Sequence, residues 1–455
     1  MTRRRIAVLL AAALVLVLCG CSMGAMENLY ALPELPEEFA ELQAMIDEIR
    51  TPGRTYAGGA ESISPVSGIN SQTVQQRDLD GDGVSEAIAF FRATGEERPL
   101  KIYIFRQANK GYEVAAVIDG DGAAIESVSY ENLNEGPAQE LVVSWQLSAN
   151  VHKLAVYSIQ GFRVNGLMET GYTRMLLQDI DRDNTKEVLT VQINTVSGES
   201  QVECWHAQGE GISLVAAAPL SSGVTAVASS PVSGMLRGET PIPALFLTSS
   251  FGEGCVTDVF AWQDGTLANI TLDPALGYSA ATVRRDAAAS PRDINGDGAV
   301  DVPIPMAFGA DYGEEAGEIF LNWISIDIRG RTKSAAITYQ NEKDRDAWYF
   351  VLPDRWSGKL VTSVRDNVSS TERTVTFSVW NGGAEETPET FLTISKLTGA
   401  NRKTRAQLGE RFFLQETGSA VYTGELHECS WDCGLDSEDV AERFRLVTRS
   451  WSSEN

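Results

Sequence analysis

Histidine is scarce in this chain of 455 residues, which contains only three: His152, His206 and His427. The sequence also lacks a G-x-S-x-G nucleophile motif, a glycine-rich phosphate loop and an H-E-x-x-H zinc motif. Many hydrolases and zinc enzymes depend on such motifs or on histidine as a general base, so these absences argue against the familiar catalytic classes. We therefore expect a protein that is not an enzyme.

Basic residues are few relative to acidic ones: 37 Lys and Arg stand against 62 Asp and Glu, which gives a formal net charge of −25. Such a chain is repelled by nucleic acids and by anionic lipid surfaces, so neither is an expected partner. It would attract divalent cations or cationic partners. The alternative is that the negative charge only keeps the surface soluble and implies no partner.

Only one long apolar run is present, Ile6 to Leu18, and its 13 residues are too few to span a bilayer. Three arginines precede it, an order that is typical of a signal peptide. The segment Leu18-Cys19-Gly20-Cys21 that closes the run resembles the lipobox of bacterial lipoproteins. The resemblance implies removal of residues 1–20 and lipid attachment to Cys21, which would anchor the protein at the extracytoplasmic face of the cell membrane. The alternative is an ordinary secretory signal with incidental cysteines.

Cysteine is also sparse, and only Cys204, Cys255, Cys429 and Cys433 follow Cys21. An even number of cysteines outside the cytoplasm permits disulfides. The pairs within one predicted domain are Cys204 with Cys255 and Cys429 with Cys433. Four reduced thiols are the alternative.

The most distinctive feature of the sequence is an acidic pattern of nine residues that recurs along the chain. It begins at Asp78, Asn132, Asp179 and Asp293, with a worn copy at Met235, so that successive starts lie 54, 47, 56 and 58 residues apart. Four short segments rich in β-branched and aromatic residues accompany each copy, and Gly, Asn and Ser separate them. This period predicts a mainly β fold, with residues 60–341 forming a β-propeller of about five blades. A pair of β-sandwiches is the structural alternative.

The best copies place oxygen ligands at positions 1, 3, 5 and 9, and calcium takes six to eight such ligands from flexible loops. An EF-hand is excluded because position 12 carries no acid. The copy at Asn132 has Gly136 and Pro137 at positions 5 and 6, so no ion is expected there. Polar turns without an ion are the alternative. Three structural Ca²⁺ sites are predicted, with these ligands: Asp78, Asp80, Asp82 and Glu86; Asp179, Asp181, Asp183 and Glu187; Asp293, Asn295, Asp297 and Asp301.

This loop pattern resembles the FG-GAP or VCBS-type repeat of integrin-like propellers, over about 280 residues. The resemblance implies calcium-binding loops between strands and an adhesion-type binding role at the cell surface.

Two other segments flank the repeats. Residues 21–59 are expected to hold the anchor, a linker and a short helix over 33–50, in which Phe39, Leu42 and Ile46 share a face. Residues 342–455 are expected to form a small α+β domain, one sheet backed by a helix over 436–451, which weakly resembles the PsbP-like module. A motif of His427, Cys429 and Cys433 lies in this domain, and a disulfide, free thiols or a metal site are its three interpretations.

We therefore expect a non-enzymatic, membrane-anchored lipoprotein that serves as a calcium-stabilised binding or scaffold protein for a protein or glycan ligand. One alternative is a polysaccharide-active propeller enzyme, and another is an accessory regulator of an envelope complex. A deep pocket with converging basic groups would favour the enzyme.

Overall fold

The structure is a computed structural model of the whole chain, and it describes residues 40–108, 111–161, 163–285, 289–309, 319–341, 348–367, 371–383 and 386–447. The expected signal peptide, the lipidation residue Cys21 and Phe39 lie outside these ranges. Within them, no helix has the length and apolar character needed to cross a membrane.

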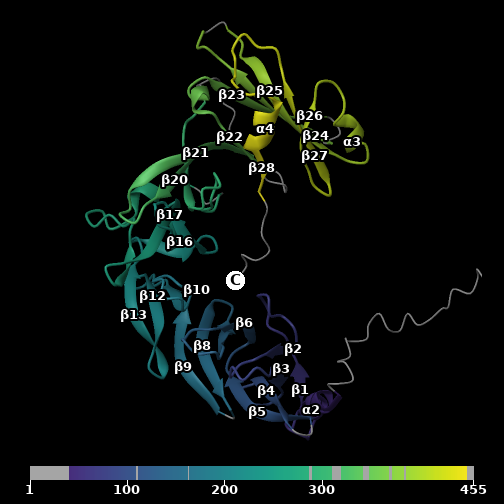
Figure 1. Cartoon of the computed structure of the whole chain (residues 1–455), viewed down its shortest axis with the longest axis vertical. Coiled ribbons are helices and arrows are strands. Elements are labelled where there is room, and N and C mark those ends of the chain that lie inside the picture. Colours follow the sequence, from purple (N-terminus) through teal and green to yellow (C-terminus); the bar gives the residue numbers. More distant parts are fainter. Residues whose placement is uncertain are drawn as a thin grey trace, which may run out of the picture.

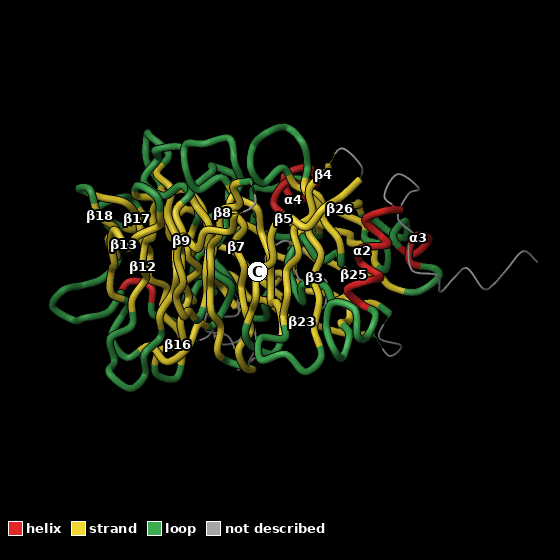
Figure 2. The backbone as a smooth tube through the Cα atoms, turned by 90° about the horizontal axis from the view of Figure 1, so that it is seen from below, coloured by secondary structure: helices red, strands yellow, loops and turns green. Residues whose placement is uncertain are grey.

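The fold is mainly β, with 53% strand and 7% helix, as the sequence predicts. The strands form six antiparallel sheets that follow one another along the chain. Five of them begin within residues 60–341, where about five blades are predicted, and the sixth lies in the segment expected to form a separate domain. Six sheets in one row do not fit a simple five-blade propeller. Figure 1 shows the sheets arranged in an open arc, from the first at the purple end to the sixth at the yellow end. Loops gather at both ends of the strands (Figure 2).

The first three sheets are numbered here in chain order. The first contains β1 (Ala60–Ser62), β2 (Val74–Arg77), β3 (Glu86–Ala93), β4 (Leu100–Ala108) and β5 (Gly111–Gly120). The second contains β6 (Ala124–Glu131), β7 (Glu140–Ser148), β8 (Val151–Gln160) and β9 (Arg163–Tyr172). The third contains β10 (Arg174–Gln178), β11 (Glu187–Gln192), β12 (Gln201–Gln208) and β13 (Gly211–Pro219).

The fourth, fifth and sixth sheets contain the strands from β14 to β28. The fourth contains β14 (Val224–Val227), β15 (Val232–Leu236), β16 (Ile242–Phe251), β17 (Gly254–Gln263) and β18 (Thr266–Asn269). The fifth contains β19 (Asp301–Pro305), β20 (Ile319–Ile326), β21 (Thr332–Asn341), β22 (Trp348–Val351) and β28 (Phe444–Leu446). The sixth contains β23 (Leu360–Asp366), β24 (Glu372–Val379), β25 (Glu389–Thr398), β26 (Phe412–Glu416) and β27 (Ala420–Leu426).

Hydrophobic cores lie between consecutive sheets. One cluster joins the first and second sheets through Leu79, Phe90 and Trp145, and further clusters join each sheet to the next one as far as the sixth. Among the described residues, no cluster joins the sixth sheet to the first. The molecule is therefore a row of sheets packed face to face, with one interface missing from a closed ring.

A repeated irregularity supports the sequence repeat. In four sheets the register shifts between the second and third strands after the acidic loop, at Ile104/Phe105, Val156/Tyr157, Cys204/Trp205 and Trp323/Ile324. Such bulges increase the local twist of a strand pair. Their common position indicates that these four sheets are copies of one structural unit.

The helix expected before the repeats is present as α2 (Ala40–Arg50), at one end of the arc (Figure 1). Leu42, Ile46 and Ile49 are buried on one face, against Phe91 and Phe105 of the first sheet. The short helix therefore covers the outer face of the first sheet, which has no sheet packed on it.

The boundary expected at residue 342 falls inside the fifth sheet, because β21 pairs with β22 across it. Phe308 and Tyr339, which precede this boundary, share a core with Phe377 and Tyr422, which follow it. Residues on both sides of 342 are therefore parts of one packed unit.

The C-terminal helix is shorter than predicted. Helix α4 spans Ser437–Arg443 and begins at the capping box of Asp436 and Asp439 that the sequence indicates. The predicted extension to residue 451 is wrong at Phe444, which begins β28 and pairs with Phe350. Phe444 lies 5.2 Å from Trp348 and 5.4 Å from Tyr422 between ring centroids, so burial among aromatic rings favours a strand there. Trp451 lies outside the described residues.

None of the four cysteines in the described ranges forms a disulfide. Cys204 lies on β12 and Cys255 on β17, and both side chains are buried. Of the two alternatives left open by the sequence, the structure has reduced thiols.

Candidate cation-binding loops

The acidic repeats form one kind of hairpin loop. Loop 1 (78–86), loop 2 (132–140), loop 3 (179–187) and loop 4 (293–301) each lie between two paired segments of one sheet. The residue before each loop pairs with position 9 of that loop: Arg77 with Glu86, Glu131 with Glu140, Gln178 with Glu187, and Arg292 with Asp301. The predicted fourth strand of each unit therefore belongs to the following sheet, since the loop joins two partners within that sheet.

Two buried residues close every loop. Position 2 is Leu79, Leu133, Ile180 or Ile294, each no more than 5% exposed. Its backbone N–H donates to the position-9 carboxylate, at 2.8 Å in loops 1 and 2, 2.9 Å in loop 3 and 3.4 Å in loop 4. Burial raises the pKa of Glu86, Glu140 and Glu187 above the ordinary glutamate value. The residue at position 2 is thus a hydrophobic anchor under each loop.

The remaining acids turn the backbone inward. In loop 1, Asp78 accepts from the backbone N–H groups of Gly81 at 2.8 Å and Gly83 at 2.9 Å. Asp82 accepts in the same way from Val84 at 2.7 Å. Loops 3 and 4 repeat these bonds at the equivalent positions. Each of these carboxylates still has a lone pair that the backbone does not use.

Positions 4 and 6 have positive φ in the three acidic loops. Glycine occupies both positions in loops 1 and 4, whereas loop 3 has Arg182 at φ 68° and Asn184 at φ 74°. Asparagine visits this region more readily than most residues, whereas an arginine there is uncommon. An arginine held there indicates that the hydrogen bonds that Asp179 accepts from the backbone N–H groups of Arg182 and Asn184 determine the turn.

The structure brings together only part of each predicted ligand set. In loop 1, oxygens of Asp78, Asp80 and Glu86 lie within 4.8 Å of one another. Asp82 is outside that group. In loop 3, the corresponding group contains Asp181, Asp183 and Glu187 but not Asp179. Loop 4 has Asn295 in place of one acid, and its three acids do not form such a group in the described part of the chain.

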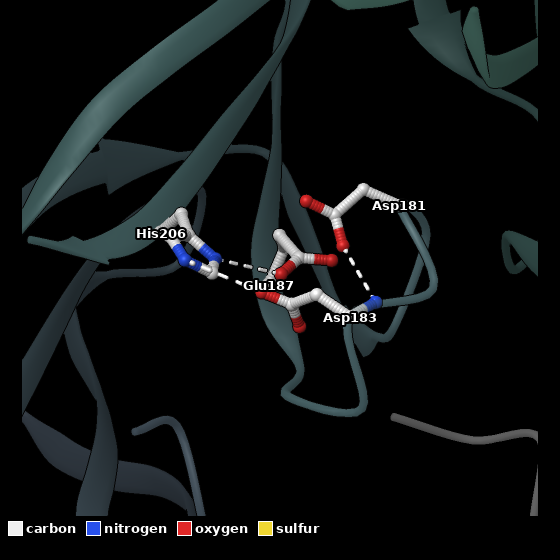
Figure 3. Close-up of side chains that lie close together, drawn as sticks. All are labelled: Asp181, Asp183, Glu187 and His206. Atoms are coloured by element: carbon white, nitrogen blue, oxygen red, sulfur yellow. Dashed lines mark hydrogen bonds and ion pairs between the residues drawn. The ribbon is translucent and has the colours of Figure 1, made fainter. Parts of the chain in front are cut away.

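A histidine that the sequence did not place at this site completes the group in loop 3 (Figure 3). His206 lies on β12, and its Nδ1 is 2.9 Å from Glu187 Oε1 while its Nε2 is 3.6 Å from Asp183 Oδ2. Desolvation opposes ionisation of Asp183, but hydrogen bonds from Thr185 and the nearby His206 lower its pKa below the usual range. Strand pairing explains the position of His206. Val188 pairs with Trp205 in an antiparallel ladder, so the next residue, His206, lies beside Glu187.

Loop 4 contains an unpaired buried charge. Asp301 is 0% exposed, and its Oδ1 has no hydrogen-bond partner among the residues that the structure describes. Burial first, and then the charges of Asp297 and Asp293, raise its pKa to about 7. A buried carboxylate oxygen without a donor is costly, so this oxygen is available to a cation.

Loop 2 fills the equivalent interior with amides. Asn134 donates its side-chain N–H to Glu140, and its Oδ1 accepts from the Gly136 backbone at 2.7 Å. Pro137 packs against Gly81 of loop 1, where an added Cβ would lie 2.8 Å from the Pro137 carbonyl carbon. In loop 2, the side-chain N–H of Asn134 therefore interacts with the Glu140 carboxylate in place of a cation.

A cavity of about 750 Å³ lies between the second and third sheets. Its charged lining contains His152 and Arg174 together with Glu126 and Glu131, and Tyr172 lies beside them. Glu131 also pairs with Lys186 at 2.6 Å. The lining is thus mixed in charge rather than basic. His427 is elsewhere, 2.8 Å from Thr393 Oγ1.

Comparison with known proteins gives no relative. No protein-family model matches the chain, and no curated protein matches it. Among solved structures, Saccharomyces cerevisiae Sqt1 is 10% identical, with a TM-score of 0.29 over 81% of this chain and 100% of that one. Rhamnogalacturonan lyase YesW is 11% identical, with a TM-score of 0.31 over 70% of this chain and 75% of its own. The exotype rhamnogalacturonan lyase YesX is 9% identical, with a TM-score of 0.24 over 72% of this chain and 75% of its own. Similarity this distant carries no argument about function.

Proposed function

We propose that the chain is a non-enzymatic binding or scaffold protein, anchored by lipid at Cys21 on the extracytoplasmic face of the membrane. Its repeats would form an open β-propeller of the FG-GAP or VCBS type, in which calcium bound by the acidic loops holds consecutive sheets together. Support comes from the repeated loop geometry and from three of the buried position-2 anchors, Leu79, Leu133 and Ile180, which lie in the cores between sheets.

The observation that carries the calcium proposal is Asp301. Its Oδ1 is buried without a donor in a loop that also holds Asp293 and Asp297. The charges of Asp297 and Asp293 add to burial in raising the pKa of Asp301, so joint ionisation of the three carboxylates is disfavoured unless a cation balances them. Calcium accepts carboxylate, amide and backbone oxygens at about 2.3–2.6 Å in flexible geometry, and loops 1 and 4 supply only oxygen ligands.

The cavity between the second and third sheets is the candidate ligand site. Its volume is in the range of small-ligand pockets, and its hydroxyl and amide lining suits a glycan or a peptide. One feature favours the enzyme alternative, namely that His152, Tyr172 and Arg174 share this cavity. Two carboxylates in the same lining, Glu126 and Glu131, disfavour an acidic polysaccharide there.

Thermal unfolding tests the calcium proposal. The chain beginning at Ser22 would be unfolded in EDTA, and then with millimolar Ca²⁺ or Mg²⁺. Each occupied site adds about 2.7 kcal/mol when free calcium exceeds its Kd a hundredfold, so we expect Tm to rise with calcium and much less with magnesium. The double variant Asp80→Asn and Asp297→Asn should lose most of this increase.

Glu135 provides the control, since it is an exposed acid of loop 2, where no ion is proposed. Glu135→Gln should keep the full calcium effect. An unchanged Tm in calcium, or an effect retained by the double variant, would show that the loops are polar turns without an ion.

A further inference from the structure

We infer that loop 3 binds a first-row transition-metal dication of the Zn²⁺ class, with His206 as its nitrogen ligand, whereas loops 1 and 4 take calcium. This inference rests on the proposed function in one respect only, that the acidic loops are cation sites. It assigns a different ion to one loop, on the basis of a side chain that the repeat pattern does not contain.

The geometry around His206 fits coordination. Its Nε2 lies 3.6 Å from Asp183 Oδ2, which is too long for a hydrogen bond. Two ligands bound at 2.0–2.2 Å around one tetrahedral ion lie about 3.4 Å apart, close to the observed separation. One ligand atom from each of Asp181, Asp183, Glu187 and His206 lies within 4.8 Å of the others, so four residues converge on one small volume (Figure 3).

The other imidazole nitrogen is held in place. Nδ1 of His206 lies 2.9 Å from Oε1 of Glu187, whose side chain is 0% exposed. A carboxylate on one ring nitrogen fixes the tautomer that leaves the other nitrogen free to bind a metal, and it raises the basicity of that nitrogen. Glu187 is itself held by the Ile180 backbone N–H at 2.9 Å, so the imidazole is oriented by a fixed group.

The equivalent positions in the other three loops contain no imidazole that could bind a metal. The residue beside Asp301 in loop 4 is Ser325. The register places Arg106 beside Glu86 in loop 1 and Ser158 beside Glu140 in loop 2. A protonated guanidinium has no lone pair to give, and a neutral hydroxyl is a weak ligand for zinc. Only loop 3 combines carboxylates with an imidazole among these four positions.

Ligand chemistry then separates the ions. Calcium is a hard cation that takes six to eight oxygens, whereas imidazole suits Zn²⁺, Co²⁺, Ni²⁺ and Cu²⁺. One nitrogen with up to three carboxylates is enough for four-coordinate binding. Loop 3 should therefore keep a transition-metal ion in the presence of millimolar calcium.

The test uses Co²⁺ as a coloured probe and Zn²⁺ as its competitor. Metal-free chain from Ser22 would be titrated with Co²⁺ in millimolar Ca²⁺, while the visible absorption is followed. We expect one equivalent of Co²⁺ to bind, and Zn²⁺ to displace it. His206→Asn should weaken this binding more than about tenfold, while His152→Asn and Asp82→Asn, the position-5 equivalent in loop 1, should not.

A second measurement needs no variant at the site. The chain has three histidines, so ¹⁵N–¹H spectra of the imidazoles can be assigned with His152→Asn and His427→Asn. Zn²⁺ in the presence of calcium should shift Nε2 of His206 alone. No shift of that nitrogen, or cobalt affinity unchanged in His206→Asn, would overturn the inference. If calcium does not raise the Tm but Co²⁺ still binds, the calcium proposal is contradicted and this inference is supported.

Discussion

At the scale of single residues, Asp301 links stability to pH. Its pKa of about 7 in the folded chain lies above the ordinary value of 3.8, so the folded state keeps a proton that the unfolded chain has lost between these values. In EDTA, its contribution to stability should be complete below pH 4 and should disappear as the pH rises through 7.

Asp301→Asn should remove that dependence and stabilise the metal-free protein at pH 8 by about 1–3 kcal/mol, because no buried charge remains. Urea unfolding at several pH values, in EDTA and in calcium, would measure both effects. A variant with the pH profile of the wild type would show that another group is responsible.

The anchors of the loops should matter without any ion. Leu79 is 0% exposed in the core between the first two sheets, so Leu79→Ala should cost about 2–5 kcal/mol in EDTA and in calcium alike. Val84 in the same loop is 42% exposed, and Val84→Ala should change stability by less than about 0.5 kcal/mol. Equal losses in both variants, measured by urea unfolding, would contradict the anchor role.

Sequence spacing identified the four loops and the acids that they share, and it separated the loop with Gly136 and Pro137 from the other three. It did not place His206, because that residue reaches loop 3 through strand pairing rather than through the repeat. Nor could it separate Asp80, which joins the loop 1 group, from Asp82, which does not. That difference depends on side-chain direction within the turn.

At the scale of elements, helix α2 replaces a neighbouring sheet. Ile46 is 4% exposed against the first sheet, so Ile46→Ala should destabilise that sheet by about 2–5 kcal/mol. Glu48 lies on the exposed face, and Glu48→Ala should have little effect. Hydrogen exchange of the first-sheet amides would localise the change, and exchange that increases equally in all sheets would argue against a local role for α2.

Hydrophobic periodicity identified the elements well but not all of their ends. The run from Val440 to Phe444 fits a helical face, and α4 nevertheless ends at Arg443. The aromatic core around Trp348 and Tyr422 determines the strand at Phe444, and a pattern read within one segment contains no information about that core.

At the scale of the whole molecule, the fifth and sixth sheets should fold together. Tyr339 and Phe377 lie on opposite sides of residue 342, with ring centroids 5.3 Å apart. A chain of residues 22–341 should therefore expose aromatic core, bind a hydrophobic dye and unfold below the Tm of a control chain of residues 22–447. Cooperative unfolding of the short chain at the Tm of the control would instead show an independent unit.

The sequence repeat suggested a row of similar β units, and the structure has such a row. The sixth sheet lies where a separate small domain was expected, and it lacks the acidic loop, so the sequence did not show that it packs on the fifth sheet and continues the row. The sheet boundaries were displaced by one strand for a related reason: the loop marks a hairpin within a sheet, and sequence alone does not say which neighbours pair.

The hydrogen bond between the position-2 N–H and the position-9 carboxylate has an evolutionary consequence. It is present in loop 2, where Asn134 occupies the interior, as well as in the acidic loops. The loop thus closes through its own chain, and loss of an ion ligand leaves the turn intact. Duplicated units are then free to drift separately, so that one copy can become ion-independent while another, with His206 beside it, changes the ion that it selects.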